Sequence, residues 1–439
     1  MIKNSIITPL QKFVNIESFA GILLLAATII ALFWANSPFG SSYTALWQHE
    51  LGFSTPILEI EKPLILWVND GLMAVFFFLI GLEIKRELLI GELNSIKKIA
   101  FPLFGALGGM LIPVMFFLLI NQNPETTKGW GIPMATDIAF SLAVLKVLGK
   151  RIPLSLIIFL TAFAIVDDLG AVMVIALFYS GELHLELLGY ASILLAILYY
   201  LSYKEVYFKY LSTAFGVIVW ILFLKSGIHP TLAGILMAFS VPIRQKILTR
   251  EFIAELETIT QNIKQAKVLN DEILSNEQII EIDNLEDLTE KYQSPLQKLE
   301  HNLHGWVAYF IIPIFALANA GVAFGDSSNL DTMLIINIII CLVLGKSMGI
   351  TSIILLAKKL NIIDIPSDIN VQHIIGVSFL AGIGFTMAIF IAGLAFQMDP
   401  VYIDSAKIGI LIGSLASAIL GYFVLRFAPS QQVKTDKPK

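Results

Sequence analysis

The feature that most limits the fold of this chain is the recurrence of apolar runs of about 20 residues, the length that a helix needs to cross a bilayer. Twelve such runs occur, 56% of all residues are hydrophobic, and the mean hydropathy is +0.79. These values are unlike those of ordinary soluble domains. They predict an all-α polytopic membrane protein with twelve transmembrane helices. The runs lie near residues 15–36, 63–84, 99–121, 129–147, 153–178, 186–203, 208–224, 227–243, 303–323, 331–356, 371–396 and 403–427.

We expect residues 1–439 to form a single integral-membrane domain. The first run follows Lys3 and Lys12 and so has features of a signal peptide,. It is long, however, and eleven further runs follow it, so we expect it to be a retained span.

The basic residues of the connecting segments indicate how the chain is oriented. Connections after even-numbered runs hold several Lys and Arg residues, whereas those after odd-numbered runs hold at most one each. By the positive-inside rule, the even-numbered connections and both termini are expected in the cytoplasm. The basic residues after even-numbered runs include Lys85, Arg86, Lys97, Lys98, Lys146, Lys150, Arg151, Lys204, Lys209, Lys358 and Lys359.

Charge and cysteine content exclude two classes of function. The net charge of −5 at pH 7 argues against nucleic acid as a partner,. The single cysteine, Cys341, lies in an apolar run, which excludes a disulfide framework and a Cys-based metal site,.

Two connections are long enough to be structured. Residues 40–62 contain a possible turn at Gly52 and predict a β-hairpin on the outer face,. Residues 245–295 hold eleven acidic and five basic residues, with apolar residues at helical intervals. This acidic insertion between runs eight and nine predicts a solvated amphipathic cytoplasmic helix or pair of helices. A mobile charged linker is the alternative.

Adjacent aspartates, Asp167 and Asp168, interrupt the fifth run. A charged residue at the centre of a membrane helix costs roughly 3 kcal/mol, so such a pair indicates a function. Neighbouring side chains on a helix diverge by about 100°. We therefore expect one carboxylate to face a cavity while the other contacts a cation, with coupled titrations. The alternative is a pair of neutral carboxyls that are hydrogen-bonded within the bundle.

Two runs contain matching interruptions. In the fourth, Thr136 and Asp137 follow a segment broken by Gly131 and Pro133, which is typical of a discontinuous helix that lines a cavity,. Asp137 as a simple helix N-cap is the alternative. In the eleventh, residues 380–387 combine glycines with a threonine, although glycines also serve close helix packing,. Matching breaks in the two halves of a chain indicate a transporter built from repeats.

Other polar residues lie within or beside the runs. Lys346 is the only lysine deep within a run, and a buried ammonium needs a carboxylate partner, for which the aspartate pair is the candidate,. A snorkelling side chain is the alternative. At the cytoplasmic ends of runs two and nine, carboxylates lie beside histidines that titrate near neutrality. Local ion pairs on a solvated helix end are the other interpretation. These residues are Glu83, Lys85, Arg86, Glu87, Glu300, His301 and His304.

The intramembrane residues indicate a class of transport chemistry. Carboxylates, the Thr136 hydroxyl and freed backbone carbonyls suit a small hard cation, and the same carboxylates bind protons. One site that holds either a cation or protons, and that faces each side in turn, exchanges the two by competition. An intramembrane aspartyl protease and a sodium channel are the alternatives; the protease would have no use for Lys346.

Several stretches closely resemble the NhaA family of bacterial sodium/proton antiporters, in the family's order and from about residue 10 to residue 427. These stretches are Trp67–Phe77, Ala135–Phe140, Val166–Ala171, Leu224–His229 and Gly382–Met387. The resemblance implies a non-enzymatic, cofactor-free inner-membrane transporter with inverted-topology repeats, in which discontinuous spans four and eleven cross near the midplane. It implies electrogenic export of Na+ or Li+ in exchange for incoming H+.

The resemblance also implies roles for individual residues. Asp168 is then the sodium ligand, Asp167 the partner of Lys346, and Thr136 a neighbour of the ion, while Asp137 and Lys346 offset the ends of the half-helices. The charged cluster at the ends of runs two and nine, together with His229, matches positions associated with pH activation, and Asp70 lies in a funnel. The 40–62 hairpin would contact a second subunit in a homodimer. The insertion at 245–295 departs from the short loop of typical members.

Overall fold

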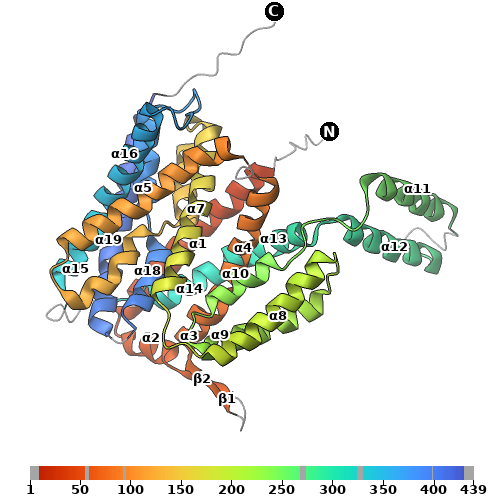
Figure 1. The fold of residues 1–439 in the computed structure, drawn as a ribbon, viewed down its shortest axis with the longest axis horizontal. Coiled ribbons are helices and arrows are strands. Elements are labelled where there is room, and N and C mark those ends of the chain that lie inside the picture. Colours follow the sequence, from red (N-terminus) through yellow and green to blue (C-terminus); the bar gives the residue numbers. More distant parts are fainter. Residues whose placement is uncertain are drawn as a thin grey trace, which may run out of the picture.

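The computed structural model describes residues 9–54, 59–91, 95–266, 273–323, 330–397 and 399–429. They are largely helical (Figure 1). The α-helices are α1 (Pro9–Ala35), α2 (Gly40–Trp47), α3 (Leu64–Leu66), α4 (Met73–Ile90), α5 (Ile96–Ile120), α6 (Ile138–Leu148), α7 (Leu154–Phe178), α8 (Leu185–Tyr203), α9 (Lys209–Ser226), α10 (Thr231–Phe239), α11 (Thr249–Gln265), α12 (Asn276–Tyr292), α13 (Pro295–Trp306), α14 (Ile312–Asn319), α15 (Thr332–Ile340), α16 (Lys346–Lys359), α17 (Val371–Ala381), α18 (Phe385–Ala395) and α19 (Pro400–Arg426).

Shorter elements interrupt or connect these helices. The 3-10 helices are η3 (Pro124–Met134) and η4 (Gly149–Arg151), and the π-helical turns are η1 (Trp67–Leu72), η5 (Val307–Ile311) and η7 (Cys341–Gly345). Strands β1 (Glu50–Ser54) and β2 (Glu59–Pro63) pair antiparallel, with Glu50 opposite Pro63 and Ser54 opposite Glu59. π-Helical turns often mark functional sites, and η7 directly precedes Lys346.

The number of membrane-spanning helices depends on how bent helices are counted. Within the described ranges, eight helices are long and apolar enough to cross a membrane, and the number rises to eleven if each of three bent pairs is one span. This result confirms a multi-pass membrane protein. The eighth expected run, 227–243, contains only α10, whose 9 residues rise about 14 Å. That is less than half of a hydrocarbon core of about 30 Å.

The interrupted fourth and eleventh runs are two of the bent pairs. Helices η3 and α6 meet at 46°, and α17 and α18 meet at 43°. In the third bent pair, the apolar part of α1 and helix α2 meet at 115°. Residues 40–47, which we expected within a hairpin, therefore form helix α2. Gly52 lies inside β1 opposite Glu61 rather than in a turn.

Short polar side chains determine where several helices begin. Asp137 accepts the Phe140 N–H before α6, and Asn370 accepts the His373 N–H before α17. Asp331 and Asp399 act in the same way before α15 and α19. Such caps satisfy backbone donors that have no partner within the helix.

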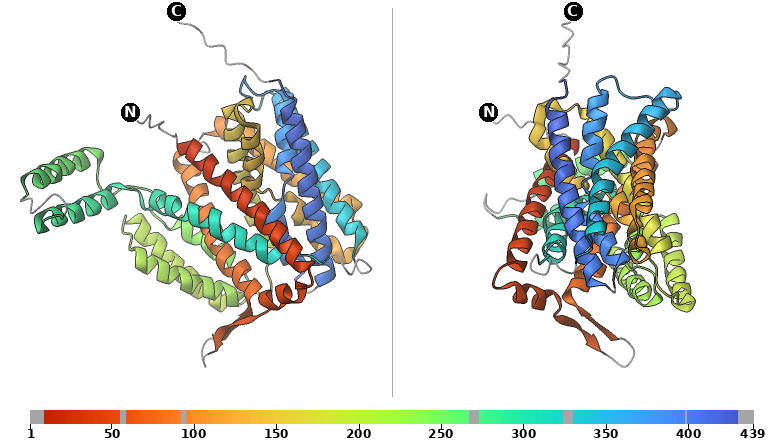
Figure 2. Two further views of the ribbon diagram at one scale, coloured as in Figure 1. Left: turned by 180° about the vertical axis from the view of Figure 1, so that it is seen from behind. Right: turned by 90° about the vertical axis from the view of Figure 1, so that its left-hand side faces the viewer.

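Helix α7 lies inside the bundle, whereas α8 and α9 lie at its edge. In the apolar 18-residue stretch of α7, 61% of the residues are buried, whereas in the corresponding stretches of α8 and α9 only 17% are buried. The two peripheral helices run together beside α10 and α4 (Figures 1 and 2). The aspartate pair on α7 therefore lies inside the bundle, with both residues buried.

The acidic insertion forms two packed helices, α11 and α12, that project from the bundle (Figures 1 and 2). The rings of Phe252 and Tyr292 stack with centroids 4.0 Å apart, and Ser275 caps α12. At its base, Lys298 Nζ lies 2.8 Å from Glu290 Oε1, and this ammonium lowers the pKa of the Glu290 carboxyl. The structure shows the expected pair of helices in this segment rather than a charged linker.

Candidate functional site

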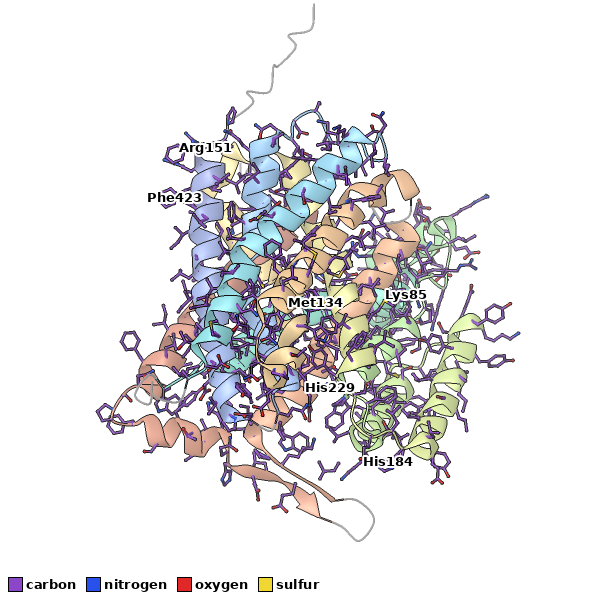
Figure 3. All side chains as sticks on the ribbon, turned by 60° about the vertical axis from the view of Figure 1, so that its left-hand side comes forward. Lys85, Met134, Arg151, His184, His229 and Phe423 are labelled. Carbon is purple, nitrogen blue, oxygen red and sulfur yellow. The ribbon has the colours of Figure 1, made fainter. Side chains whose placement is uncertain are left out.

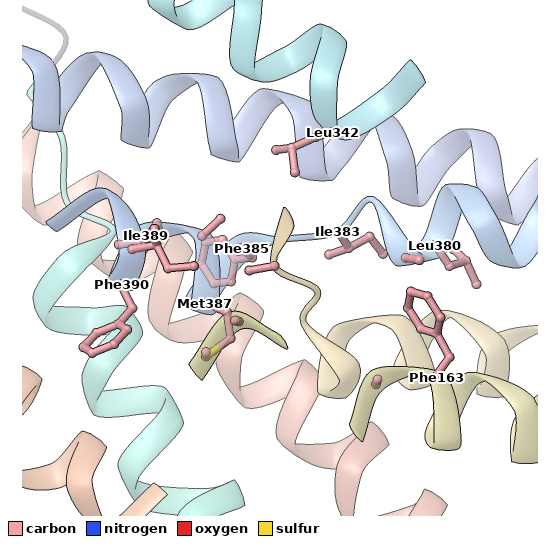
Figure 4. Close-up of a cluster of buried hydrophobic side chains, with 14 of the residues drawn as sticks. Phe163, Leu342, Leu380, Ile383, Phe385, Met387, Ile389 and Phe390 are labelled. Carbon is pink, nitrogen blue, oxygen red and sulfur yellow. The ribbon is translucent and has the colours of Figure 1, made fainter. Parts of the chain in front are cut away.

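The two interrupted spans meet at their breaks. Thr136 Oγ1 donates to the Ala381 carbonyl over 2.9 Å, and the Asp137 N–H donates to the Ile383 carbonyl over 2.6 Å. Figure 4 shows Ile383 on the non-helical link between α17 and α18, with a second irregular segment passing beside it. Each break thus satisfies backbone groups of the other, which keeps irregular backbone viable at membrane depth.

Asp137 joins the N-termini of two half-helices. Its Oδ1 accepts the Phe140 N–H of α6 over 3.1 Å. Its Oδ2 accepts both the N–H and the hydroxyl of Thr386, in α18, over 3.2 and 2.6 Å. The two interpretations of Asp137 therefore coincide, because this N-cap residue also lies at a helix break. A carboxylate is favoured there, since both helix ends present unsatisfied N–H groups.

Lys346 is fully buried at the start of α16, directly after the π-helical turn η7. Its Nζ donates to Thr136 Oγ1 over 2.7 Å and to Asp167 Oδ2 over 2.9 Å. It also lies 5.8 Å from the centroid of the Phe163 ring. Since Lys346 has 0% exposure, the snorkelling alternative is wrong.

Close packing holds α16 in this position. A Cβ atom on Gly349 would overlap the Gly108 carbonyl of α5, and one on Gly108 would overlap the Gly349 carbonyl. The two backbones can therefore touch only because both residues are glycines, a common device in membrane helix packing.

Asp168 differs from Asp167 in its contacts. It is 5% exposed, and within the described part of the chain its buried Oδ1 has no hydrogen-bond partner. Asp167 keeps Oδ2 on Lys346, while its Oδ1 also lacks a partner there. A buried carboxylate oxygen without a partner loses solvation that something else must replace. A proton or a small cation meets that requirement.

The charged residues at the ends of α4 and α13 form one group. Arg86 lies 3.0 Å from Glu87 and 3.1 Å from Glu300, and Glu83 lies 3.8 Å from His304. Lys85, on the same turn as Arg86, donates to the carbonyls of Phe239 and Val241 at the C-terminal end of α10, and His301 is exposed on α13. The sequence predicts that all seven of these residues lie in one cluster, and the structure brings them to one end of the bundle.

His229 lies apart from that group. Its Nε2 is 3.9 Å from Asp70 Oδ1, and Asp70 also pairs with Lys62 over 2.9 Å. Figure 3 shows His229 nearer than Lys85 to the end of the bundle from which the strands extend. Asp70, Lys62 and His229 line a cavity of about 760 Å³, together with Glu125 and Tyr179. His229 therefore shares a cavity with the expected funnel residue Asp70.

Sequence reasoning missed three residues that contact the site. Thr386 donates twice to Asp137, Ser141 donates to the Leu380 carbonyl over 2.8 Å, and Lys62 pairs with Asp70. Thr386 is the threonine within residues 380–387, where the sequence indicated a break but no role for this side chain. Ser141 and Lys62 had no comparable signal.

Comparison with known proteins places this geometry in context. A family model described as Na+/H+ antiporter 1 matches residues 11–425. An Na(+)/H(+) antiporter NhaA of Oleidesulfovibrio alaskensis is 45% identical over 431 residues, which cover 96% of this chain and 94% of the relative. Antiporter NhaA 1 of Saccharophagus degradans is 44% identical, covering 96% and 92%. Antiporter NhaA of Bacteroides fragilis strain YCH46 is 41% identical, covering 98% and 100%.

Proposed function

This chain belongs to the NhaA family of Na+/H+ antiporters, and we propose that it exports Na+ or Li+ in exchange for H+ through the carboxylates of Asp167 and Asp168. The observation that carries this proposal is the buried Oδ1 of Asp168, which has no hydrogen-bond partner among the described residues and lies beside the Asp167–Lys346 pair. A negatively charged oxygen in that position is stabilised most by a bare cation or by a proton. Either occupant excludes the other, and this exclusion couples the two fluxes.

Two carboxylates also explain unequal charge movement. One Na+ held by Asp168, with help from Asp167 and Thr136, is replaced by protons on both carboxylates. Lys346 holds Asp167 Oδ2 between these events, as it does in this structure. If two protons enter for each Na+ that leaves, each cycle carries net positive charge inward and is electrogenic. Li+ is accepted for the same reason as Na+, because both are hard cations that prefer oxygen ligands.

The proposed membrane arrangement has twelve spans, with α10 as the short eighth and the two broken spans crossing at the site. Both termini and the arm formed by α11 and α12 then lie in the cytoplasm of a bacterial inner-membrane protein. The β1–β2 pair lies on the outer face and contacts a second subunit. Alternating access follows from movement of the two breaks. Residues 135–141 and 380–386 are joined by a few hydrogen bonds, which can be exchanged for others as the breaks move.

The cluster at the ends of α4 and α13 is proposed to adjust activity to cytoplasmic pH. The cluster combines histidines with carboxylates, and histidine is the side chain whose charge ordinarily changes near neutral pH. Protonation would change the Arg86–Glu300 and Glu83–His304 contacts, which join α4 to α13. Helix α4 also approaches α7, so a shift of α4 can reach the aspartate pair.

Exchange in proteoliposomes tests the proposed site. Added Na+ should dissipate an imposed proton gradient in vesicles that contain this protein, as read by a trapped pH-sensitive dye. Asp168→Asn should abolish the response, because an amide binds a cation weakly and takes no proton in this range. Asp331→Asn is the matched control, since asparagine also caps helices well and Asp331 caps α15.

Three outcomes would remove the proposal in different ways. Full activity of the Asp168→Asn variant would overturn the site assignment. Sodium flux without proton counter-flow would favour a channel. Cleavage of a membrane protein by the purified chain would favour an intramembrane aspartyl protease.

A further inference from the structure

Helix α18 begins inside the protein, where its first N–H groups have no helical partner. Its first intrahelical bond joins the Ala388 N–H to the Gly384 carbonyl over 2.9 Å. The N–H groups of Phe385, Thr386 and Met387 precede that bond, and the side chains of all three are buried. A buried donor without an acceptor costs free energy, so each of these groups needs an acceptor from outside the helix.

Two different helices supply acceptors. Asp137, before α6, accepts the Thr386 N–H. Ser414, on α19, accepts the Phe385 N–H through Oγ over 3.2 Å, and its side chain is 6% exposed. The start of α18 is thus held from one side by the fourth span and from the other by the twelfth.

Packing against α19 restricts the same link. A Cβ atom on Gly382 would lie 2.7 Å from Ser417 Oγ and would overlap the Leu342 carbonyl of η7. Ser417, one turn after Ser414, is fully buried, and its hydroxyl has no partner among the described residues. The link between α17 and α18 therefore rests directly on α19, close to Ser414.

We propose that Ser414 is a positioning residue for cation exchange: its hydroxyl holds the start of α18 and so sets how Thr386 meets Asp137 beside the ion site. This inference rests on the function proposed above. Without the hydroxyl, the Phe385 N–H loses the acceptor that Ser414 provides inside the protein. The first turn of α18 then shifts, and the contact of Thr386 with Asp137, which borders Thr136, shifts with it.

Two readouts test Ser414. In Ser414→Ala, the Na+ concentration for half-maximal exchange should rise about threefold to tenfold, the effect of one hydrogen bond, while the maximal rate changes less. Ser414→Thr keeps a hydroxyl and should restore the original value. Hydrogen exchange should accelerate in the peptide that contains Phe385 and Thr386 in the alanine variant, and this measurement needs no transport activity.

Ser405→Ala is the matched control. Ser405 lies on the same helix, is fully buried and accepts the Asp331 N–H over 2.9 Å, but it lies away from the break. The Ser405→Ala variant should leave unchanged both the Na+ concentration for half-maximal exchange and the hydrogen exchange of the peptide that contains Phe385 and Thr386. Equal effects of Ser405→Ala and Ser414→Ala, or unchanged hydrogen exchange in Ser414→Ala, would overturn the positioning role. A wild-type protein that fails to exchange Na+ for H+ would instead overturn the proposed function, and hydrogen exchange would still report on Ser414.

Discussion

The Asp167–Lys346 pair shows the cost of placing charge inside this protein. Both side chains have 0% exposure, and their atoms Oδ2 and Nζ lie 2.9 Å apart. Removing two charges from water costs several kcal/mol per ion, which their attraction offsets only with good geometry and further hydrogen bonds. Thr136 supplies one such bond to Lys346. The pair is therefore costly to break by removing one partner.

Lys346→Met should lower the free energy of unfolding by about 3–5 kcal/mol, because Asp167 is left as a buried charge without its partner. Combining it with Asp167→Asn should recover most of that loss, since the charge is removed as well. Thermal denaturation of the purified protein in detergent measures both effects. Lys358→Met, at an exposed position on the same helix, is the control. Equal stability of the single and double variants would contradict the buried-pair interpretation.

At the scale of elements, the break between α17 and α18 depends on the absence of side-chain volume. Gly382 has an ordinary helical φ of −72°, so an alanine there would not be strained by its backbone. The obstacle is space, because the Leu342 carbonyl and Ser417 Oγ occupy the place of a Cβ atom. The link between α17 and α18 is thus packed against η7 and α19 as well as against the break before α6.

Gly382→Ala should force the link away from η7 and α19, with a loss of stability of about 1–3 kcal/mol, as is typical of overpacking. Because η7 directly precedes Lys346, transport should fall as well. Gly393→Ala on α18 is the matched control, as nothing lies within 4 Å of the added Cβ. That variant should be neutral or more stable by about 0.5–1 kcal/mol. A Gly382→Ala protein as stable as Gly393→Ala would show that the link has room to move.

At the scale of the whole molecule, the α11–α12 arm is joined to the bundle by a narrow base. The Lys246 N–H donates to the Lys291 carbonyl over 3.0 Å, and the Leu296 N–H donates to the Pro242 carbonyl over 3.2 Å. These bonds hold together the two chain segments that enter and leave the arm. The bond between Leu296 and Pro242 lies outside residues 248–292, so the arm can be removed without separating α10 from α13.

Replacing residues 248–292 by a short flexible linker should leave the Na+ affinity unchanged and move the pH of half-maximal activity downward. The removed residues 248–292 include eleven acidic and four basic residues, a net charge of −7. Negative charge favours the protonated form of nearby groups, so its removal lets the cluster of α4 and α13 lose protons at lower pH. Salt should diminish the shift, because the Debye length is about 10 Å at 0.1 M. An unchanged pH profile at low salt would show that the arm does not act on the cluster.

Much of this protein could be anticipated from its apolar runs, because a bilayer requires helices of nearly fixed length. The breaks at Asp137 and Gly382 were also visible, since Gly, Pro and short polar residues are unusual within such runs. The contacts of His229, Lys62 and Ser414 were not visible. His229 and Ser414 depend on partners far along the chain, Asp70 and Phe385, whereas Lys62 lies eight residues before its partner Asp70 but in another element. Nothing in the local pattern around these residues specifies a partner.

The sequence alone was enough to predict a multi-pass helical protein, the carboxylates within its runs and the family. It was enough because the lipid solvent and the helical period impose apolar residues on every run of the sequence. Tertiary structure decided which carboxylate contacts Lys346, how the two breaks satisfy each other, and that α19 supports the start of α18. Those outcomes depend on rotation and contact between helices, which hydrophobic patterning leaves open when every face of a helix is apolar.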